Sequence, residues 1–405
     1  MINKIFNVGL RGATLASKFA LLFVLAKYLE PSAVGLYGLI VVTVAYGMYP
    51  LGFEFYTYSA REVIKANNNL KGQFLKSQIA FHIVLYLFVT PTFCLIFYYG
   101  VLPWYVAPFF FVLLLTEHAN QEFMRMLIAI QRPVAATFLL FIRHGSWAIL
   151  VAFLFVFVPD TRDIKTVLIA WSIGGVIAFI IGVAKIKTTI KKGWDLPIDW
   201  AWVKRGVKIA LPMFMGALSL NFITTADRYW FENLVSSDAL GAYVFYMAIT
   251  ASAISFIEAG VFSFIYPAMI VSVGAGDKVQ FNDLLSKMLL QAFVLSLFFA
   301  TMILFFVDIL LELISRPLYF ELKYLLYPML IMMIIQVLSY VPNYALYARN
   351  EDKPIVISNV LSVFVFFGSA SFFVLWSEKI AISLALITVY MFLLLYKYYF
   401  YSKLE

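Results

Sequence analysis

Charged side chains lie inside apolar segments of this sequence, where their presence needs a chemical reason. Arg11 and Lys18 stand seven residues apart in the first such segment, so a helix there carries both on one face. A charge at the centre of a lipid bilayer costs about 2.5–3.5 kcal/mol on insertion scales, so it requires a partner or a ligand. Arginine binds phosphate oxygens through a planar fork, and lysine acts as a point charge. The two residues are therefore a candidate anion-binding site.

The apolar segment over residues 102–130 carries acidic, basic and imidazole groups together. Glu117 and Arg125 are eight residues apart and share one stripe of a helix, and His118 and Glu122 form the stripe beside it. All four side chains are candidates for contact with a ligand inside the membrane.

The segment over residues 134–158 adds Arg143 and His144. If it enters the membrane from the same side as the segment over residues 5–28, Lys18 lies roughly 20 Å along the first helix, at about the depth of these two residues. We therefore expect the three side chains to share one level of a helical bundle.

Two interpretations of these groups stay open. In the first, the cations bind an anionic head group, and the carboxylates hold the cations in place when the site is empty. In the second, each carboxylate pairs with an arginine, Arg143 or Arg125, and joins two helices without contacting a ligand. The histidines could relay protons near neutral pH, but histidines that pack with satisfied hydrogen bonds explain the pattern as well.

The composition indicates a membrane protein. Of 405 residues, 63% are hydrophobic and 13% are charged, and the mean hydropathy is +0.92. Soluble domains carry about 45–50% apolar and about 25% charged residues. Apolar segments of about twenty residues recur along the chain, each long enough to cross a hydrocarbon core of about 30 Å.

Several function classes are excluded by the sequence. The formal charge of +8 comes mainly from basic residues in short loops, which is a topology signal and predicts no nucleic-acid partner. The sequence has no GxxxxGK[ST] phosphate loop, which excludes nucleotide hydrolysis by that route. Cys94 is the single cysteine, which excludes a disulfide framework and a cysteine-rich metal site. We expect no metal, no cofactor and no catalytic residue.

The apolar runs predict an all-α polytopic membrane protein with about twelve transmembrane helices. Residues 1–190 form an N-terminal lobe of six helices, 191–205 a cytoplasmic interfacial linker rich in Lys and Trp, and 206–405 a C-terminal lobe of six helices. The expected helices span residues 5–28, 33–60, 75–99, 102–130, 134–158, 164–186, 206–232, 238–271, 281–308, 317–347, 354–376 and 379–401.

The distribution of basic residues predicts the orientation. With a cytoplasmic N-terminus, 20 of the 30 Lys and Arg residues fall on the cytoplasmic side, seven on the opposite side and three within helices. Because basic residues concentrate in cytoplasmic loops, we expect both termini in the cytoplasm.

An internal repeat supports the two lobes. The sequence EPSAVGLYG, which contains Gly35 and Tyr37, resembles SSDALGAYV, which contains Gly241 and Tyr243. Six spans return the chain to its starting side, so the two halves share one orientation. The repeat therefore predicts a symmetry axis along the membrane normal, between two lobes.

Three stretches carry a family resemblance over essentially the whole chain. They are LASKFALLFVLAKYLEPSAVGLYG near the start, QRPVAATFLLFIRHGSW after the fourth expected helix, and LPMFMGALSLNFITTADRYW followed by LGAYVFY at the start of the second lobe. The sequence resembles the Wzx-type O-antigen flippases, within the superfamily of multidrug, oligosaccharidyl-lipid and polysaccharide exporters.

The resemblance implies two six-helix lobes around a central cavity that opens to each side in turn. It implies a flippase that moves an undecaprenyl-pyrophosphate-linked O-antigen or related repeat unit from the cytoplasmic to the periplasmic face of the bacterial inner membrane. The implied partners are this lipid-linked oligosaccharide, membrane lipids, and polymerase and chain-length machinery. The charged residues described above would then bind the pyrophosphate head group.

Two alternatives remain. A proton- or sodium-coupled drug or small-molecule antiporter of the same superfamily predicts that carboxylates dominate over cations. A membrane glycan polymerase predicts a long external domain, whereas the external loops here are shorter than about a dozen residues. We therefore expect a transporter and no enzyme.

Overall fold

Helices build the whole of the described chain. The computed structural model describes residues 2–404, except for the side chains of residues 2–5 and 8, and it contains no strand within that range. The helices of the first half of the chain are α1 (Ile2–Tyr28), α2 (Pro31–Gly52), α3 (Tyr56–Lys65), α4 (Lys71–Val89), α5 (Cys94–Tyr98), α6 (Ala107–Ala129), α7 (Pro133–Phe141), α8 (Trp147–Phe157) and α9 (Ile164–Thr189).

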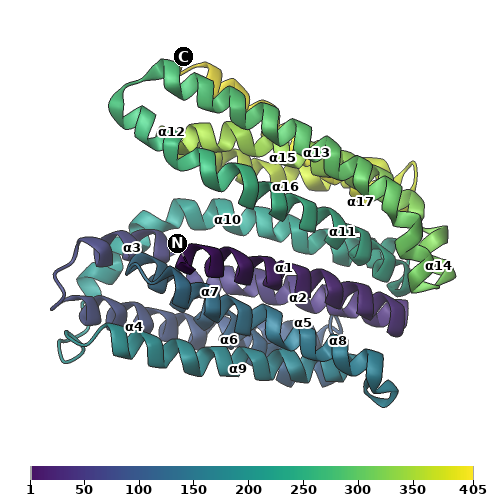
Figure 1. Cartoon of the computed structure of the whole chain (residues 1–405), viewed down its shortest axis with the longest axis horizontal. Coiled ribbons are helices and arrows are strands. Elements are labelled where there is room, and N and C mark those ends of the chain that lie inside the picture. The colour runs from purple at the N-terminus through teal and green to yellow at the C-terminus, as the bar shows by residue number, and fades with distance from the viewer. Residues whose placement is uncertain (1, 405) are drawn as a thin grey trace. The chain divides into compact units, whose positions relative to one another are not determined.

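The second half of the chain holds eight further helices, labelled in Figure 1 where there is room. They are α10 (Trp200–Leu234), α11 (Ser237–Ile257), α12 (Ser263–Ala275), α13 (Lys278–Ile314), α14 (Pro317–Glu321), α15 (Leu326–Ala348), α16 (Asp352–Val374) and α17 (Glu378–Ser402). Short 3-10 or π segments continue several of them: η1 (Thr90–Phe93), η2 (Trp104–Val106), η3 (Ile142–Ser146), η4 (Pro159–Thr161), η5 (Glu258–Phe262) and η6 (Lys323–Leu325).

Eleven of the twelve predicted membrane spans are confirmed. Eleven segments of the described chain are long and apolar enough to cross a bilayer. The twelfth expected span is α6, whose 23 residues cover about 34 Å at 1.5 Å per residue. Its hydropathy is lower because it carries a run of polar and charged residues from Glu117 to Arg125. The chain is therefore an all-α, multi-pass membrane protein.

Two compact units divide the chain. Unit 1 comprises residues 1–24 and 40–214, and unit 2 comprises residues 25–39 and 215–405. The limits fall within α1, α2 and α10, so each of these helices contributes to both units. The interfacial linker expected over residues 191–205 lies inside unit 1.

One expected helix is broken. The sequence predicts a continuous helix over residues 33–60, but α2 ends at Gly52 and α3 starts at Tyr56. Phe53 and Glu54 between them have φ angles of 53° and 50°. The left-handed conformation costs roughly 1–2 kcal/mol for a residue with a Cβ, so packing must hold it in place. The hydroxyl of Thr57 donates to the carbonyl of Glu54 at 2.8 Å and stabilises the turn.

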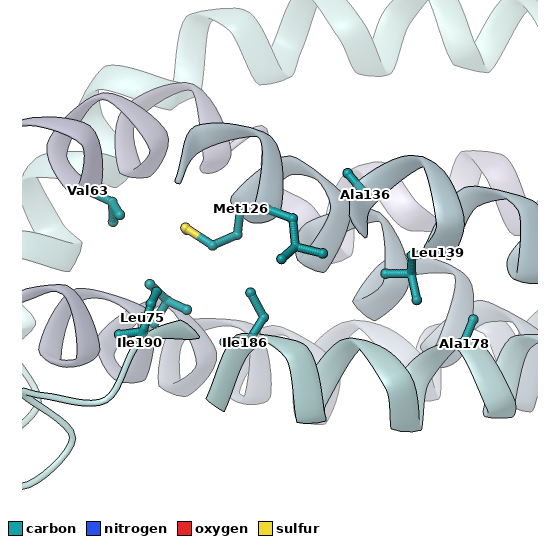
Figure 2. Close-up of a cluster of buried hydrophobic side chains, with 9 residues drawn as sticks. Val63, Leu75, Met126, Ala136, Leu139, Ala178, Ile186 and Ile190 are labelled. Atoms are coloured by element: carbon teal, nitrogen blue, oxygen red, sulfur yellow. The ribbon is translucent and has the colours of Figure 1, made fainter. Parts of the chain in front are cut away.

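A hydrophobic cluster joins five helices of unit 1 (Figure 2). Val63 of α3, Leu75 of α4 and Met126 of α6 are at most 6% exposed. Burying an aliphatic side chain of this size contributes about 1.5–3 kcal/mol. The cluster is completed from α6, α7, α9 and the residue after α9 by Leu127, Ala136, Leu139, Ala178, Ile186 and Ile190.

The linker between α9 and α10 is bound to α4. The ammonium of Lys76 donates to the carbonyls of Trp194 at 3.1 Å and Leu196 at 2.9 Å. The backbone N–H of Gly72 donates to the carbonyl of Lys192 at 3.1 Å, and a Cβ at Gly72 would lie 2.4 Å from that oxygen. Trp202 stacks on Phe74 with ring centroids 4.9 Å apart. The linker is therefore a packed part of unit 1.

Unit 2 combines a helical bundle with the ends of α1 and α2. Helices α15, α16 and α17 lie side by side in Figure 1. The turn between α1 and α2 packs on the first turns of α11, where a Cβ at Gly241 would lie 2.1 Å from the carbonyl oxygen of Pro31. Gly35 approaches the same turns, since its Cβ would lie 2.9 Å from the carbonyl oxygen of Ser237. Arg316 adds an ion pair with Glu30 at 3.0 Å.

Candidate functional site

Helix α6 organises the polar interior of unit 1. It presents Glu117 and His118 to its neighbours, with exposed fractions of 2% and 1%. Asn120 on the same helix donates to the carbonyl of Gly175 in α9 at 2.9 Å. A spanning helix with so many polar groups is stable only where other helices supply hydrogen-bond partners.

The first group of contacts surrounds Glu117. One carboxylate oxygen forms an ion pair with Arg143, and the other accepts a 2.7 Å hydrogen bond from the indole N–H of Trp171. The side chains of Arg143 and Glu117 are 5% and 2% exposed. Nε2 of His144 lies 3.8 Å from Glu117. This carboxylate thus joins α6, the helix that carries Arg143, and α9.

A π-helical segment, η3 (Ile142–Ser146), positions Arg143. Such segments insert an extra residue into a turn, change the direction of the following side chains and often occur at functional sites. The indole N–H of Trp147 donates to the carbonyl of Arg143 at 2.8 Å. Trp147 in turn stacks on Trp171 with centroids 5.5 Å apart, so both partners of Glu117 belong to one packed layer.

The second group of contacts surrounds Arg125. It forms an ion pair with Glu122 at 2.7 Å and approaches Glu54 at 4.0 Å. Its guanidinium lies 3.6 Å from the ring centre of Tyr56, in cation–π contact. The other oxygen of Glu122 accepts a hydrogen bond from the amide of Gln78 at 2.7 Å. This group therefore links α4 and α6 with the chain after α2.

Helix α4 contributes residues that the sequence analysis missed. Besides Gln78, they are His82 and Tyr86, whose hydroxyl lies 2.6 Å from Nδ1 of His118. The rings of His82 and His118 meet edge to face with centroids 4.8 Å apart, and Nε2 of each ring is buried without a hydrogen-bond partner among the described residues. The spacing of Gln78, His82 and Tyr86 by four residues in an apolar helix is the signal that could have identified them.

Arg11 and Lys18 differ from the other candidates. Both side chains are exposed on α1, and neither forms a hydrogen bond or ion pair with any described residue. Lys18 interacts electrostatically with Glu117, Arg143 and His144. The structure therefore brings Lys18 close to the Glu117 group and leaves its ammonium free for another partner.

The described part of unit 2 contains one buried ion pair. Asp227 is fully buried, contacts Arg228 at 3.1 Å and accepts a 2.9 Å hydrogen bond from the hydroxyl of Tyr243. Glu258 stands in the π segment η5, is partly exposed and has no ion pair with the described residues. Glu258 is therefore a carboxylate of unit 2 that a ligand could reach.

Comparisons with known proteins address the fold. No protein-family model and no curated protein sequence matches the chain. An inward-facing multidrug resistance MATE family transporter of the MOP superfamily aligns with a TM-score of 0.80 at 11% identity, over 96% of this chain and 94% of its own length. The chain has the fold of the MATE transporters.

Other structures with this fold agree. MATE in a bent conformation gives a TM-score of 0.65 at 12% identity over 99% of this chain and 95% of its own. A MOP superfamily transporter from Pyrococcus furiosus gives a TM-score of 0.61 at 12% identity, over 99% of this chain and 93% of its own length. That protein is described as having a binding pocket of reverse polarity that suggests a different function. At these identities the match establishes the fold, and the substrate has to be argued from the residues.

Proposed function

We propose that this chain is a transporter of the multidrug, oligosaccharidyl-lipid and polysaccharide exporter superfamily that moves an anionic, lipid-linked oligosaccharide across the inner membrane by alternating access. The fold supports the superfamily and the mode of transport. The anionic substrate is supported by one observation on unit 1. Its exposed intramembrane charges, Arg11 and Lys18, are both cations, whereas its carboxylates are held by arginines.

The arrangement of charge explains why an anion is preferred. Glu117 is bound by Arg143, and Glu122 is bound by Arg125, so neither carboxylate is available to a cationic drug. A phosphate group near Lys18 meets an unpaired ammonium in a medium of low dielectric constant, where the attraction is much stronger than in water. We therefore assign head-group binding to Arg11 and Lys18. The buried contacts of Arg143 favour the interpretation that it joins helices.

The more specific assignment of the substrate rests on the sequence resemblance. An undecaprenyl-pyrophosphate-linked O-antigen or related repeat unit, moved from the cytoplasmic to the periplasmic face, combines an anionic head group with a glycan. Deleting the gene should leave single lipid-linked repeat units on the cytoplasmic face. If single units still reach the outer surface while long polymer disappears, the protein acts in polymerisation and the proposal is wrong.

Substitutions of Lys18 test the head-group site. In a deletion strain complemented with variants, Lys18→Ala should reduce surface glycan strongly, and Lys18→Arg should retain most of it. Lys27→Ala, farther along the same helix, is the matched control and should export normally. Export is divided by the amount of folded protein in the membrane. Normal export per folded molecule in Lys18→Ala would reject the assignment.

An antiporter of cationic compounds is the second candidate, and Glu258 favours it because a partly exposed carboxylate without an ion pair can bind a cation. Glu258→Gln separates the two functions. If Glu258→Gln loses drug or dye efflux and its surface glycan is unchanged, the antiporter is favoured. If the unchanged protein shows no drug or dye efflux and Glu258→Gln still exports glycan, the flippase is favoured.

A further inference from the structure

Unit 2 contains a surface cavity of about 460 Å³ that is lined by none of the charged residues described above. Its size falls in the range of about 300–1,000 Å³ that small-molecule sites occupy. The loops after α12 and α15 supply its charged lining, and the topology predicted from the basic residues puts both loops on the cytoplasmic side. Residues that line it include Asp277, Lys278, Phe281, Arg349, Glu351 and Leu404.

Two aromatic rings fix the guanidinium of Arg349 at this cavity. It lies 4.6 Å from the ring centre of Phe281 and 4.9 Å from that of Tyr401, and these rings are 2% and 4% exposed. Cation–π contact on both rings holds the plane of the guanidinium in a defined orientation. Among the described residues, nothing accepts a hydrogen bond from its N–H groups. Arg349 is therefore held in place with its donors available.

The two acidic residues of the cavity, Glu351 and Asp277, stand at the same position relative to the ends of the preceding helices, α15 and α12. After α15, the N–H of Glu351 donates to the carbonyl of Leu346 at 3.0 Å, and after α12 the N–H of Asp277 donates to the carbonyl of Ser272 at 3.0 Å. Both are the six-to-one bond of a Schellman motif, with Asn350 and Gly276 in the left-handed conformation before them. The same local geometry thus brings an acidic residue to the cavity from each loop.

The charges of the cavity do not neutralise one another by direct contact. Arg349, Lys278, Asp277 and Glu351 form no ion pair within 4 Å among the described residues. Two cations and two carboxylates that line one cavity without pairing suit a ligand that carries both signs of charge. The exposed side chains of Leu404 and Val279, 41% and 83% exposed, put apolar surface beside them.

We propose that this cavity binds the zwitterionic phosphoethanolamine head group of a membrane phospholipid. The phosphate would be bound by the fork of Arg349 and by Lys278, as arginine and lysine bind phosphate oxygens. The primary ammonium would donate to Glu351 and to Oδ2 of Asp277, whose Oδ1 accepts the N–H of Gln280 at 2.8 Å. The acyl chains would lie on the apolar surface near Leu404. Basic pockets between membrane helices on the cytoplasmic side bind the phosphates of lipid head groups such as that of cardiolipin. This inference is independent of the transported substrate.

Native mass spectrometry of the purified full-length protein tests the site. Phosphatidylethanolamine, phosphatidylglycerol and phosphatidylcholine are added separately at equal concentration. We expect retention of phosphatidylethanolamine above the other two, because phosphatidylglycerol lacks the ammonium and the quaternary ammonium of phosphatidylcholine has no N–H to donate. Equal retention of the three lipids by the unchanged protein would overturn the proposal.

Three variants assign the binding to named groups. Arg349→Ala should reduce retention of phosphatidylethanolamine about tenfold, and Arg349→Lys should reduce it less because the charge remains. Glu351→Gln, whose side chain caps no helix, should retain lipid but lose the preference for phosphatidylethanolamine over phosphatidylglycerol. Arg61→Ala, an exposed arginine on α3, is the control and should bind as the parent does. Unchanged retention in Arg349→Lys together with unchanged preference in Glu351→Gln would reject the site, even if Arg349→Ala does not fold.

Soluble compounds distinguish the source of the head group. O-phosphoethanolamine and inorganic phosphate are added to the lipid-loaded protein at millimolar concentration. A membrane lipid gains affinity from its acyl chains, so we expect neither compound to displace it. Displacement by O-phosphoethanolamine at these concentrations would show that the cavity takes a soluble phosphate compound, and the lipid assignment would be wrong.

Discussion

Arg143 and Glu117 form an ion pair inside unit 1, with side chains 5% and 2% exposed. They are 26 positions apart in the sequence and come from different helices. The second oxygen of Glu117 is bound by Trp171, so the carboxylate has no exposed face in this arrangement. The pair therefore contributes to the packing of α6 against its neighbours.

The buried pair predicts a specific response to substitution. Arg143→Ala leaves Glu117 charged and buried, and breaking such a pair costs about 3–5 kcal/mol. We expect the membrane abundance and thermal stability of this variant to fall. The double variant Arg143→Ala, Glu117→Gln removes the uncompensated charge and should recover a large part of both. If the single variant is as stable as the parent but loses export, Arg143 binds substrate directly and the packing role is wrong.

The contact between Gly241 and Pro31 predicts a steric effect in unit 2. A Cβ at Gly241 would lie 2.1 Å from the carbonyl oxygen of Pro31, far inside van der Waals contact. Gly241→Ala should therefore lower the melting temperature of the protein in detergent, because overpacking of this kind costs about 1–3 kcal/mol. Gly274→Ala in α12 is the matched control, since its Cβ would meet nothing within 4 Å. It should melt at the parent temperature or slightly above it, and equal destabilisation of both variants would contradict the steric explanation.

The expected orientation can be tested by labelling single cysteines in a background with Cys94 replaced. An impermeant thiol reagent should label Asp160→Cys and Ser315→Cys in whole cells but leave Lys192→Cys and Asp277→Cys unlabelled until the membrane is opened. All four positions are exposed, so the side of the membrane and not burial decides the result. Labelling of Lys192→Cys from outside would reject the topology.

The docked linker predicts protection from proteolysis. Lys191 and Lys192 are exposed sites for trypsin, but the linker beside them is held by the two hydrogen bonds from Lys76. Lys76→Met should speed cleavage after these lysines in purified protein. Lys71→Met, on the same helix but without a side-chain hydrogen bond to a described residue, should be cut at the parent rate. Equal rates in all three proteins would mean that these hydrogen bonds do not hold the linker.

Most of the secondary structure could be predicted from the sequence because hydropathy and helix ends are local properties. The expected helix over residues 164–186 corresponds to α9 (Ile164–Thr189), where Asp163 caps the first turn. The expected helix over 238–271 corresponds to α11, η5 and α12, which start after the cap Ser236. Runs of about twenty apolar residues leave few alternatives in a bilayer, because every backbone group must be bonded within the segment.

The partners of the polar side chains were decided by the tertiary structure. The sequence identified Glu117 and Arg143 as candidate site residues. It did not decide whether they pair with each other, bind a ligand or do both. The π segment η3 turns Arg143 toward Glu117, and the left-handed pair Phe53 and Glu54 ends α2 early. A helical pattern fixes which residues share a face, whereas the neighbour of that face depends on how distant helices pack. The same reason hid the roles of Gln78 and Arg349, whose partners come from other helices.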